Sequence, residues 1–219
     1  KNGNLITPIT YEYGIRSFSD GLASIRTDRK YGFINKKGEI VIPCIYDYAG
    51  DFSEGMASVM INDKQGFIDK TGQIVIPCIY GNVDKLTSYA TLAGADVYKF
   101  ENGLAWVKMD NKYGFIDKTG NVVIPLIYDD VESFKGNLAK ATVNNKVGFI
   151  DKTGAVAIPF IYDDVATFSE NLAKVTIDEK HGFIDMQGNV RIPLVYDGAL
   201  SFSEGLACVR MHSKQGFTY

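Results

Sequence analysis

A segment of about 34 residues recurs along almost the entire chain, and this repetition constrains the fold more than any other feature. The stretch KYGFINKKGEIVIPCIYDYAGDFSEGMASV, residues 30–59, is followed 34 residues after its start by the similar KQGFIDKTGQIVIPCIYGNV. Such a period is typical of repeat architectures, in which each unit buries apolar side chains against its neighbours. The K-x-G-F motif begins at Lys30, Lys64, Lys112, Lys146, Lys180 and Lys214, in steps of 34, 48, 34, 34 and 34 residues.

Two further segments recur in phase with this motif. The six prolines all lie in segments that resemble I-P-x-I-Y, and a segment that resembles F-S-E-G-L-A-x-V also occurs six times. The prolines are Pro8, Pro43, Pro77, Pro125, Pro159 and Pro193. The other segment begins at Phe18, Phe52, Phe100, Phe134, Phe168 and Phe202. We therefore predict a single repeat domain of six units that spans residues 1–219.

Within one unit, short strands alternate with turns. Residues 22–26 and 31–35 are rich in side chains that favour strands, and residues 40–46 form a third run around Pro43. Gly38 lies between the last two runs, where a hairpin turn requires a positive φ. Because Pro43 has no N–H group to donate, it indicates an edge, a bulge or a strand end. Each unit is therefore predicted to be an all-β, three-stranded antiparallel meander, to which residues 47–53 can add a fourth short strand.

Both faces of the predicted strands carry apolar side chains, which a single unit cannot bury alone. Ala23 and Ile25 point to one face and Leu22 to the other, because side chains alternate along a strand. Ala23 and Gly32 recur in the units as small residues, which indicates close approach between neighbours. Stacked meanders form either a closed propeller-like toroid or an open β-solenoid. We predict the closed toroid, with the N-terminal strand completing the last blade, and keep the solenoid as the alternative.

These segments resemble the WG-repeat (KWG-repeat) proteins, whose unit reads roughly K-W-G-F-I-D-x-x-G-x-x-V-I-P-x-x-Y-D followed by F-S-E-G-L-A-x-V. The family's Trp is replaced here by Tyr31, Gln65, Tyr113, Val147, His181 and Gln215. The segment 134–137, F-K-G-N, also departs from F-S-E-G. The resemblance covers essentially the whole chain, and it implies a mostly bacterial, repeat-bearing interaction or structural protein.

Composition excludes several classes of protein. The net charge of −3 at pH 7 provides no basic excess for a nucleic-acid partner, and no apolar run is long enough for membrane insertion. Cys44 and Cys78 follow the prolines of successive repeats, where small buried side chains are expected; a disulfide between the repeats is the alternative. Because no Cys and His residues have zinc-binding spacing, neither a metal nor a cofactor is expected. Composition leaves the compartment open.

No catalytic motif is present, and the recurring polar residues have structural interpretations. His181 and His212 stand alone, so the chain is not expected to be an enzyme. The aspartates Asp69, Asp117, Asp151 and Asp185 lie where a strand meets a turn, a position that favours backbone hydrogen bonding over calcium binding or catalysis.

The six lysines of the K-x-G-F motifs are the first candidate site. In a ring, Lys30, Lys64, Lys112, Lys146, Lys180 and Lys214 would form a basic mouth for an anion. The favoured alternative is that each lysine pairs with a carboxylate of its unit or a neighbour. The acids considered for this role are Asp20, Glu54, Glu101, Glu170 and Glu204.

The second candidate site lies where the repeat is interrupted. The step from Lys64 to Lys112 contains 14 extra residues, and we assign residues 81–102 to an inserted loop. Insertions in repeat proteins often lie on the binding face. Beyond the insertion is Trp106, the only tryptophan, at a position that we expect to face solvent and that other units fill with Ser24, Ser58, Lys140, Lys174 and Cys208. The partner-binding candidates are Trp106, Tyr89, Tyr98 and Leu86; the alternative is that the insertion covers Trp106 as a local cap.

The predicted function is a non-catalytic interaction scaffold that presents loops to a protein or glycan partner. A regular scaffold with one irregular loop and no catalytic group favours this interpretation. The alternative is a structural or assembly module of a larger bacterial protein. An enzyme with a site in a central channel is the least favoured hypothesis.

Overall fold

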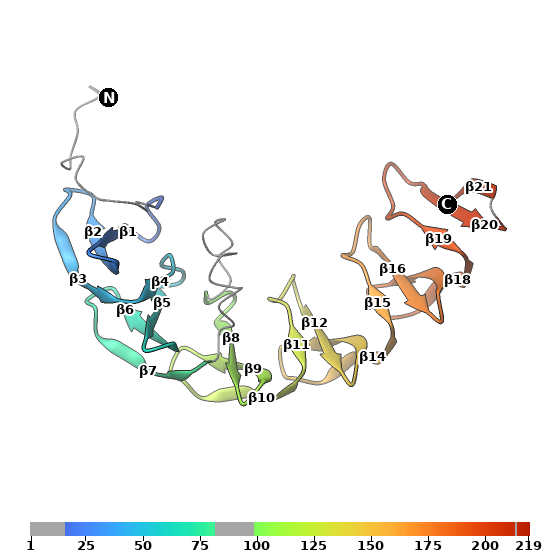
Figure 1. Cartoon of the computed structure of the whole chain (residues 1–219). Helices are drawn as coiled ribbons and strands as arrows, with labels where there is room; N and C mark the ends of the chain where they lie inside the picture. The colour runs from blue at the N-terminus through green and yellow to red at the C-terminus, as the bar shows by residue number, and fades with distance from the viewer. Residues whose placement is uncertain (1–15, 82–98, 213) are drawn as a thin grey trace, which may run out of the picture. The chain divides into compact units, whose positions relative to one another are not determined.

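The computed structural model describes residues 16–81, 99–212 and 214–219 (Figure 1). These residues form six small antiparallel sheets, and the chain divides into two compact units, residues 1–127 and 128–219. The sheets confirm the all-β prediction. No helix in the described part of the chain has the length and apolar character that a membrane crossing needs. The assignment of residues 1–219 to one domain stays a prediction.

The first compact unit contains three meanders of consecutive strands. The first sheet consists of β1 (Leu22–Thr27), β2 (Lys30–Asn35) and β3 (Ile40–Tyr46). The second sheet consists of β4 (Tyr48–Ala49), β5 (Met56–Ile61), β6 (Lys64–Asp69) and β7 (Ile74–Tyr80). The third sheet consists of β8 (Leu104–Met109), β9 (Lys112–Asp117) and β10 (Val122–Tyr128), which ends at the boundary of the unit.

The second compact unit repeats this pattern. Its first sheet consists of β11 (Asp130–Val131), β12 (Leu138–Val143), β13 (Lys146–Asp151) and β14 (Val156–Tyr162). Its second sheet consists of β15 (Asp164–Val165), β16 (Leu172–Ile177), β17 (Lys180–Asp185) and β18 (Val190–Tyr196). Its third sheet consists of β19 (Gly198–Ala199), β20 (Ala207–Met211) and β21 (Lys214–Thr218).

The predicted fourth short strand exists, but it belongs to the following sheet. After β3 the chain crosses over as β4, and Tyr48 and Ala49 pair with Met60 and Val59 of β5. The strands β11, β15 and β19 pair with the next long strand in the same way. The short strands β4, β11, β15 and β19 therefore each connect one repeat with the next. The sheets have three or four strands, rather than three throughout.

The hairpin between the first two long strands closes with two residues of positive φ in the first five sheets. Between β5 and β6, Asn62 and Asp63 have φ values of 52° and 59°. Two consecutive positive φ values are typical of a type I′ turn, whose twist matches that of the flanking strands, and Asn and Asp tolerate this region better than most side chains. The recurring Asp and Asn residues at this position therefore fix the register of the hairpin.

Pro43, Pro77, Pro159 and Pro193 lie in a bulge of the third long strand, as one of the predicted alternatives stated. Tyr31 pairs with Tyr46 and Phe33 with Ile42, so three residues of β3 face the single residue Gly32 of β2. A Cβ atom on Gly32 would lie 2.5 Å from the carbonyl oxygen of Ile42. The close approach that requires this glycine is therefore within one sheet, and not between neighbouring units as predicted.

The sheets pack face to face, as the apolar pattern predicts. Within each compact unit, the interface joins the face of one sheet that carries the K-x-G-F phenylalanine to the opposite face of the next sheet. The cluster between the first two sheets contains Leu22, Phe33, Ile42, Tyr46, Ala49, Phe52, Ala57, Val59 and Ile68. Four of the recurring alanines are buried at these faces, namely Ala57, Ala105, Ala173 and Ala207. Small side chains therefore do permit close stacking.

Candidate functional site

Trp106 lies on β8 and forms an aromatic and cationic cluster with two residues of the same hairpin. Its ring centroid lies 5.5 Å from that of Tyr113 on β9, at an interplanar angle of 58°. The ammonium of Lys108 lies 5.1 Å from the centroid of the Tyr113 ring. Lys108 and Tyr113 are cross-strand partners, so the three side chains share one face of the hairpin.

The position of Trp106 is less exposed than predicted. Ser24 and Ser58, which occupy it in the first two sheets, are 0% and 1% exposed, and Trp106 itself is partly buried. The prediction of a solvent-facing position is wrong because this position shares a face with Leu22, which packs on the following sheet. Most of the insertion 81–102 lies outside the described residues, as do the candidates Leu86, Tyr89 and Tyr98.

Three of the K-x-G-F lysines, Lys30, Lys146 and Lys180, form ion pairs, which supports their structural interpretation. Lys30 pairs with Asp47, and the other oxygen of Asp47 accepts the N–H of Asn62 in the next sheet at 2.9 Å. The Lys30 ammonium and the Asn62 amide hold the pKa of Asp47 below its usual value. The same arrangement recurs with Lys146 and Asp163 at 2.5 Å, and with Lys180 and Asp197 at 2.5 Å. In the second repeat, Gly81 occupies the position that corresponds to Asp47 and lies beside Lys64. This position therefore offers Lys64 no carboxylate.

Three of the acids proposed as partners of these lysines, Asp20, Glu54 and Glu170, have a different role. In the first junction between sheets, the hydroxyl of Ser19 donates to the carbonyl of Phe52 at 2.6 Å, and Asp20 accepts the N–H of Gly55 at 2.7 Å. We call this pair of hydrogen bonds the Ser–acid tether. It recurs as Ser53 to Phe100 at 2.7 Å with Gly103 to Glu54 at 3.0 Å, and as Ser169 to Phe202 at 2.8 Å with Gly205 to Glu170 at 2.9 Å. At these three junctions the tether holds one loop of this type on the next.

The strand-end aspartates organise the second turn of each unit, as predicted. Asp69 accepts hydrogen bonds from the N–H groups of Thr71 and Gln73 at 2.8 and 3.0 Å, and from the Thr71 hydroxyl at 2.6 Å. These bonds hold the pKa of Asp69 below its usual value, with the Thr71 hydroxyl as the largest cause. Asp117, Asp151 and Asp185 accept the equivalent backbone bonds.

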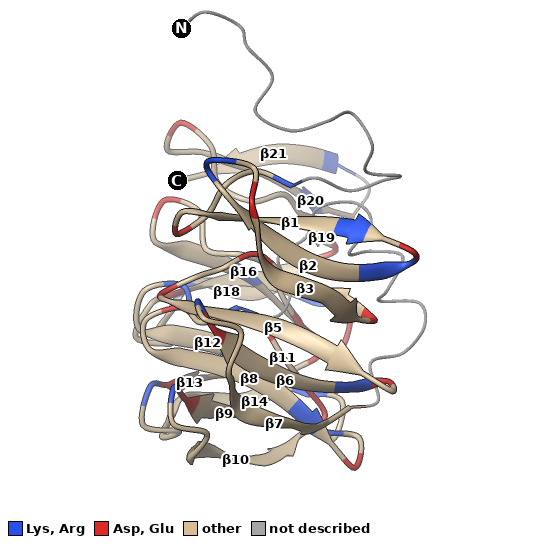
Figure 2. Cartoon of the chain, turned by 90° about the vertical axis from the view of Figure 1, so that its left-hand side faces the viewer, with Lys and Arg blue, Asp and Glu red and all other residues tan. Residues whose placement is uncertain are grey.

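The third long strands expose apolar side chains, a feature that the sequence analysis did not use. On β7, Ile79 is 50% exposed, and Ile45 at the same position of β3 is 54% exposed. Figure 2 shows that β3 and β7 carry no charged side chains along their length, whereas charges gather at turns and strand ends. The consecutive apolar residues Ile74, Val75 and Ile76 could have indicated this, because successive side chains of a strand point to opposite faces.

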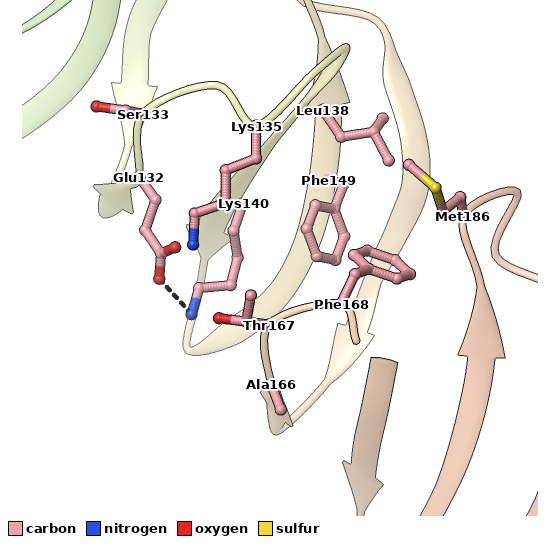
Figure 3. Close-up of a pocket in the computed structure, with 10 residues that line it drawn as sticks. All are labelled: Glu132, Ser133, Lys135, Leu138, Lys140, Phe149, Ala166, Thr167, Phe168 and Met186. Carbon is pink, nitrogen blue, oxygen red and sulfur yellow. Dashed lines mark ion pairs between the residues drawn. The ribbon is translucent and has the colours of Figure 1, made fainter. Parts of the chain in front are cut away.

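A pocket between two sheets of the second compact unit was also missed. It has a volume of about 140 Å³ and lies where β12 and β13 face the loop before β16 (Figure 3). Its walls include Leu138, Phe149, Phe168 and Met186. The departure of residues 134–137 from F-S-E-G was the available signal, because these residues lie at this junction.

No catalytic arrangement was found in the described ranges. His181 shares a hydrogen bond of 2.9 Å with the hydroxyl of Thr176, and burial lowers its pKa. No three His, Cys, Asp or Glu side chains among the described residues lie close enough to hold a metal ion. Cys44, Cys78 and Cys208 are free thiols, so no disulfide joins the repeats, and burial raises the pKa of Cys44 and Cys78.

Comparison with models of known protein families identifies the family of the repeat. The model of the WG containing repeat matches residues 1–31, 31–64, 66–87, 96–113, 113–146, 148–180 and 182–214. The chain belongs to the WG containing repeat family. This confirms the resemblance inferred from the K-x-G-F, I-P-x-I-Y and F-S-E-G segments, although the family's tryptophan is absent before each glycine. No curated protein matches the chain.

Comparison with solved structures found similar chains of low sequence identity. KlHsv2 with loop 6CD replaced by a Gly-Ser linker has a TM-score of 0.50 and 10% identity, over 89% of this chain and 74% of that one. A eukaryotic initiation factor has a TM-score of 0.49 and 11% identity, over 89% of this chain and 58% of that one. The Neurospora crassa Pan2 WD40 domain has a TM-score of 0.32 and 15% identity, over 90% of this chain and 71% of that one. The WG-repeat chain thus has a β-propeller-like repeat fold.

Proposed function

We propose that this WG-repeat chain is a non-catalytic interaction scaffold whose β8–β9 hairpin contacts a protein or glycan partner. The observation that carries this proposal is the cluster of Trp106, Tyr113 and Lys108. Serine fills the position of Trp106 in the first two sheets and is buried there, so the fold does not require a large ring. Partly exposed Trp and Tyr rings provide contact area at low entropic cost and are enriched at binding sites.

The test is Trp106→Ser, which introduces the residue that the first two sheets have at this position. Lys174→Ser changes the same position of β16 and is the matched control. Pull-downs from cell extract and a glycan array would compare the two variants with the wild type. Loss of the same partner with Trp106→Ser alone supports the proposal, and the assay that reveals the partner separates protein from glycan. Equal capture by all three chains would exclude this site.

A second candidate function, an assembly module, is favoured by the exposed third strands. Ile45 and Ile79 lie on β3 and β7, each the last strand of its sheet and each without charged residues. Uncharged apolar edge strands favour pairing with another chain. Sedimentation velocity over a wide range of concentration should then show association that Ile45→Lys and Ile79→Lys abolish. Monomers at every concentration would reject this candidate.

We also infer that the repeats close into a toroid through the N-terminal segment. This proposal is supported by the last described sheet, in which β21 is an edge and Phe217 is 73% exposed, whereas its equivalent Phe183 is buried. Residues 1–15, which lie outside the described residues, contain the Pro8 segment that would add a third strand. Deletion of residues 1–11 should then accelerate hydrogen exchange of the β21 amides. Unchanged exchange would favour the open solenoid.

A further inference from the structure

The junction between the second and third sheets shows how a regular pair of units is held together. The Ser53 hydroxyl donates to the carbonyl of Phe100, and Glu54 accepts the N–H of Gly103. Lys118, in the turn after β9, adds a hydrogen bond of 2.9 Å to the carbonyl of Glu54 and an ion pair of 3.0 Å with its carboxylate. Phe100 is fully buried, and its ring centroid lies 4.9 Å from that of Phe67.

The junction between the sheets β11–β14 and β15–β18 lacks all three of these contacts. Lys135 and Gly136 replace the Ser and Glu of the tether, and Met186 replaces the lysine of the turn. A lysine ammonium cannot accept the loop amide, glycine has no side chain, and methionine cannot form an ion pair. The three substitutions are at separate points of one junction, and each removes a link that the regular junction has.

The consequence is a looser phenylalanine pair. The ring centroids of Phe149 and Phe168 lie 5.4 Å apart, and Phe168 is only partly buried. At the regular junctions the equivalent rings lie 4.8 to 4.9 Å apart and the first ring of each pair is fully buried. Loss of the tether therefore coincides with space beside the rings.

That space is an apolar pocket of about 140 Å³. Figure 3 shows the rings of Phe149 and Phe168 beside each other, with Leu138 and Met186 at the same end of the pocket. A cavity of about 150 Å³ lined by Leu, Ile and Phe is large enough for benzene. The pocket therefore has room for one aromatic ring or one branched aliphatic group.

The other end of the pocket is positively charged. Lys140 forms an ion pair with Glu132, whereas no ion pair of Lys135 is found among the described residues. Both ammonium groups lie on the Glu132 side of the pocket in Figure 3, away from Met186. Two ammoniums and one carboxylate leave one positive charge. A ligand that fills the apolar end could therefore place a single negative charge near Lys135.

We propose that this pocket binds a small monocarboxylate that carries one aromatic or branched aliphatic group. Two sources share this chemistry: a free aromatic acid, and the C-terminal residue of a peptide that ends in Phe or Leu. The site lies in the second compact unit and involves neither Trp106 nor the exposed third strands. The proposal is therefore independent of the proposed scaffold function, and either can fail alone.

The test is an NMR titration of the full chain, labelled with ¹³C at the methionine methyl groups, with 3-phenylpropionate. The methyl signal of Met186 should shift and saturate at millimolar ligand, while that of Met56, which is buried between other sheets, should not. The neutral 3-phenylpropionamide should bind more weakly. A Met186 signal that no ligand moves, or equal binding of acid and amide, would overturn the proposal.

Substitutions around the pocket test where the ligand binds and whether the charge of Lys135 attracts its carboxylate. Lys135→Ser should weaken binding about two- to fivefold, as expected for one solvent-exposed charge pair, and Glu132→Gln should strengthen it by a similar factor. The triple variant Lys135→Ser, Gly136→Glu, Met186→Lys rebuilds the regular junction and should weaken binding at least about tenfold. Because it lacks the Met186 methyl group, its binding is compared with that of the wild type by saturation-transfer NMR on the signals of 3-phenylpropionate. The triple variant should also melt at a higher temperature, which shows that lost binding is not lost folding. Binding of wild-type strength by the triple variant places the ligand elsewhere and overturns the proposal.

Two peptide ligands distinguish the sources. N-acetyl-glycyl-phenylalanine with a free carboxylate should shift Met186 as 3-phenylpropionate does if peptide C-termini enter the pocket, and its C-terminal amide should not. A shift with 3-phenylpropionate alone assigns the site to free acids. Shifts of equal size with the peptide acid and its amide would contradict the requirement for a carboxylate.

Discussion

The regular junction around Phe100 and the irregular junction around Phe168 each join two stacked sheets through an equivalent pair of phenylalanines. They differ in the loops at the junction. In the first, a serine, a glutamate and a lysine fix the loop of the next unit. In the second, all three are replaced, and a pocket lies beside the rings. The stacking of the repeats is therefore separable from the links between their loops.

The free energies of apolar burial and of hydrogen bonding explain why the two sheets of the irregular junction still stack. Burial of one large apolar side chain contributes about 1.5–3 kcal/mol, and each interface between sheets buries several of them. A hydrogen bond contributes about 0.5–1.5 kcal/mol net. Loss of the Ser–acid tether therefore removes roughly 1–3 kcal/mol, which loosens a loop without separating the sheets. A repeat protein can thus open a pocket at one junction and keep its fold.

The largest expected difference between the junctions is in the cost of removing the second phenylalanine. Phe100→Ala should lower the free energy of unfolding by about 3–5 kcal/mol, the usual loss for a fully buried ring. Phe168→Ala should cost clearly less, about 1–2 kcal/mol, because its ring is partly exposed beside an existing pocket. Urea denaturation of the two variants measures the difference. Equal losses would mean that the pocket does not loosen the ring.

The strand glycines test whether the two junctions differ in their sheets. A Cβ atom on Gly66 or Gly148 would lie 2.5 or 2.6 Å from a carbonyl oxygen of the neighbouring strand. Gly66→Ala and Gly148→Ala should therefore each destabilise the fold by about 1–3 kcal/mol, and by similar amounts. Gly198→Ala on β19 is the control, because the atoms nearest its Cβ position belong to the flexible Arg210 side chain at 3.4 to 3.6 Å, and its melting temperature should stay close to that of the wild type. Unequal losses of stability in Gly66→Ala and Gly148→Ala would mean that the sheets themselves contribute to the difference between the two junctions.

An exchange of the loop residues tests the tether itself. Ser53→Lys with Glu54→Gly should destabilise the regular junction by about 1–3 kcal/mol, because two hydrogen bonds and one ion pair are lost. Lys135→Ser with Gly136→Glu should stabilise the irregular junction by about 1 kcal/mol. Thermal melts of the two double variants should move in opposite directions. If both variants lose stability, the loops are adapted to their own units and the tether is not transferable.

Much of this fold follows from the sequence because its strands and turns depend on local signals. The repeat of proline, glycine and apolar runs predicts six meanders, and Pro43 indicates the bulge that the structure contains. The reason for Gly32 could not be predicted, because the carbonyl that excludes a Cβ atom comes from the bulge on the neighbouring strand. The short strand β4 was assigned to the wrong sheet for the same reason, since pairing with β5 is not a local property.

The candidate sites were harder to predict, because they depend on which unit each residue faces. Charge alone suggested that Lys30 would pair with an acid such as Asp20, but Lys30 pairs with Asp47 and Asp20 accepts the amide of Gly55. The position of Trp106 was expected to face solvent, although it shares a face with stacked side chains. The pocket could have been suspected from F-K-G-N, but only the structure shows that Met186 lies at the same junction.

The smallest expected effect is a difference in acid sensitivity. Burial alone would raise the pKa of Glu54, but hydrogen bonds from Lys118 and from the amides of Gly103 and Asn102 outweigh it and lower the pKa below the usual 4.5. A carboxyl group with a lowered pKa contributes stability that is fully present above its unfolded-state pKa and is lost as the pH falls through the folded-state value.

The wild type should therefore melt about 1–2 °C above Glu54→Gln at neutral pH, and this difference should shrink below pH 4.5 as Glu54 is protonated. The size is small because the Glu54 side chain is 33% exposed, so solvent screens its interactions. The irregular junction has Gly136 at this position and lacks this carboxylate. Gly136→Glu, made together with Lys135→Ser and Met186→Lys, should introduce the same pH dependence there. A pH-independent gain from this triple variant would mean that packing, and not the carboxylate, stabilises the rebuilt junction.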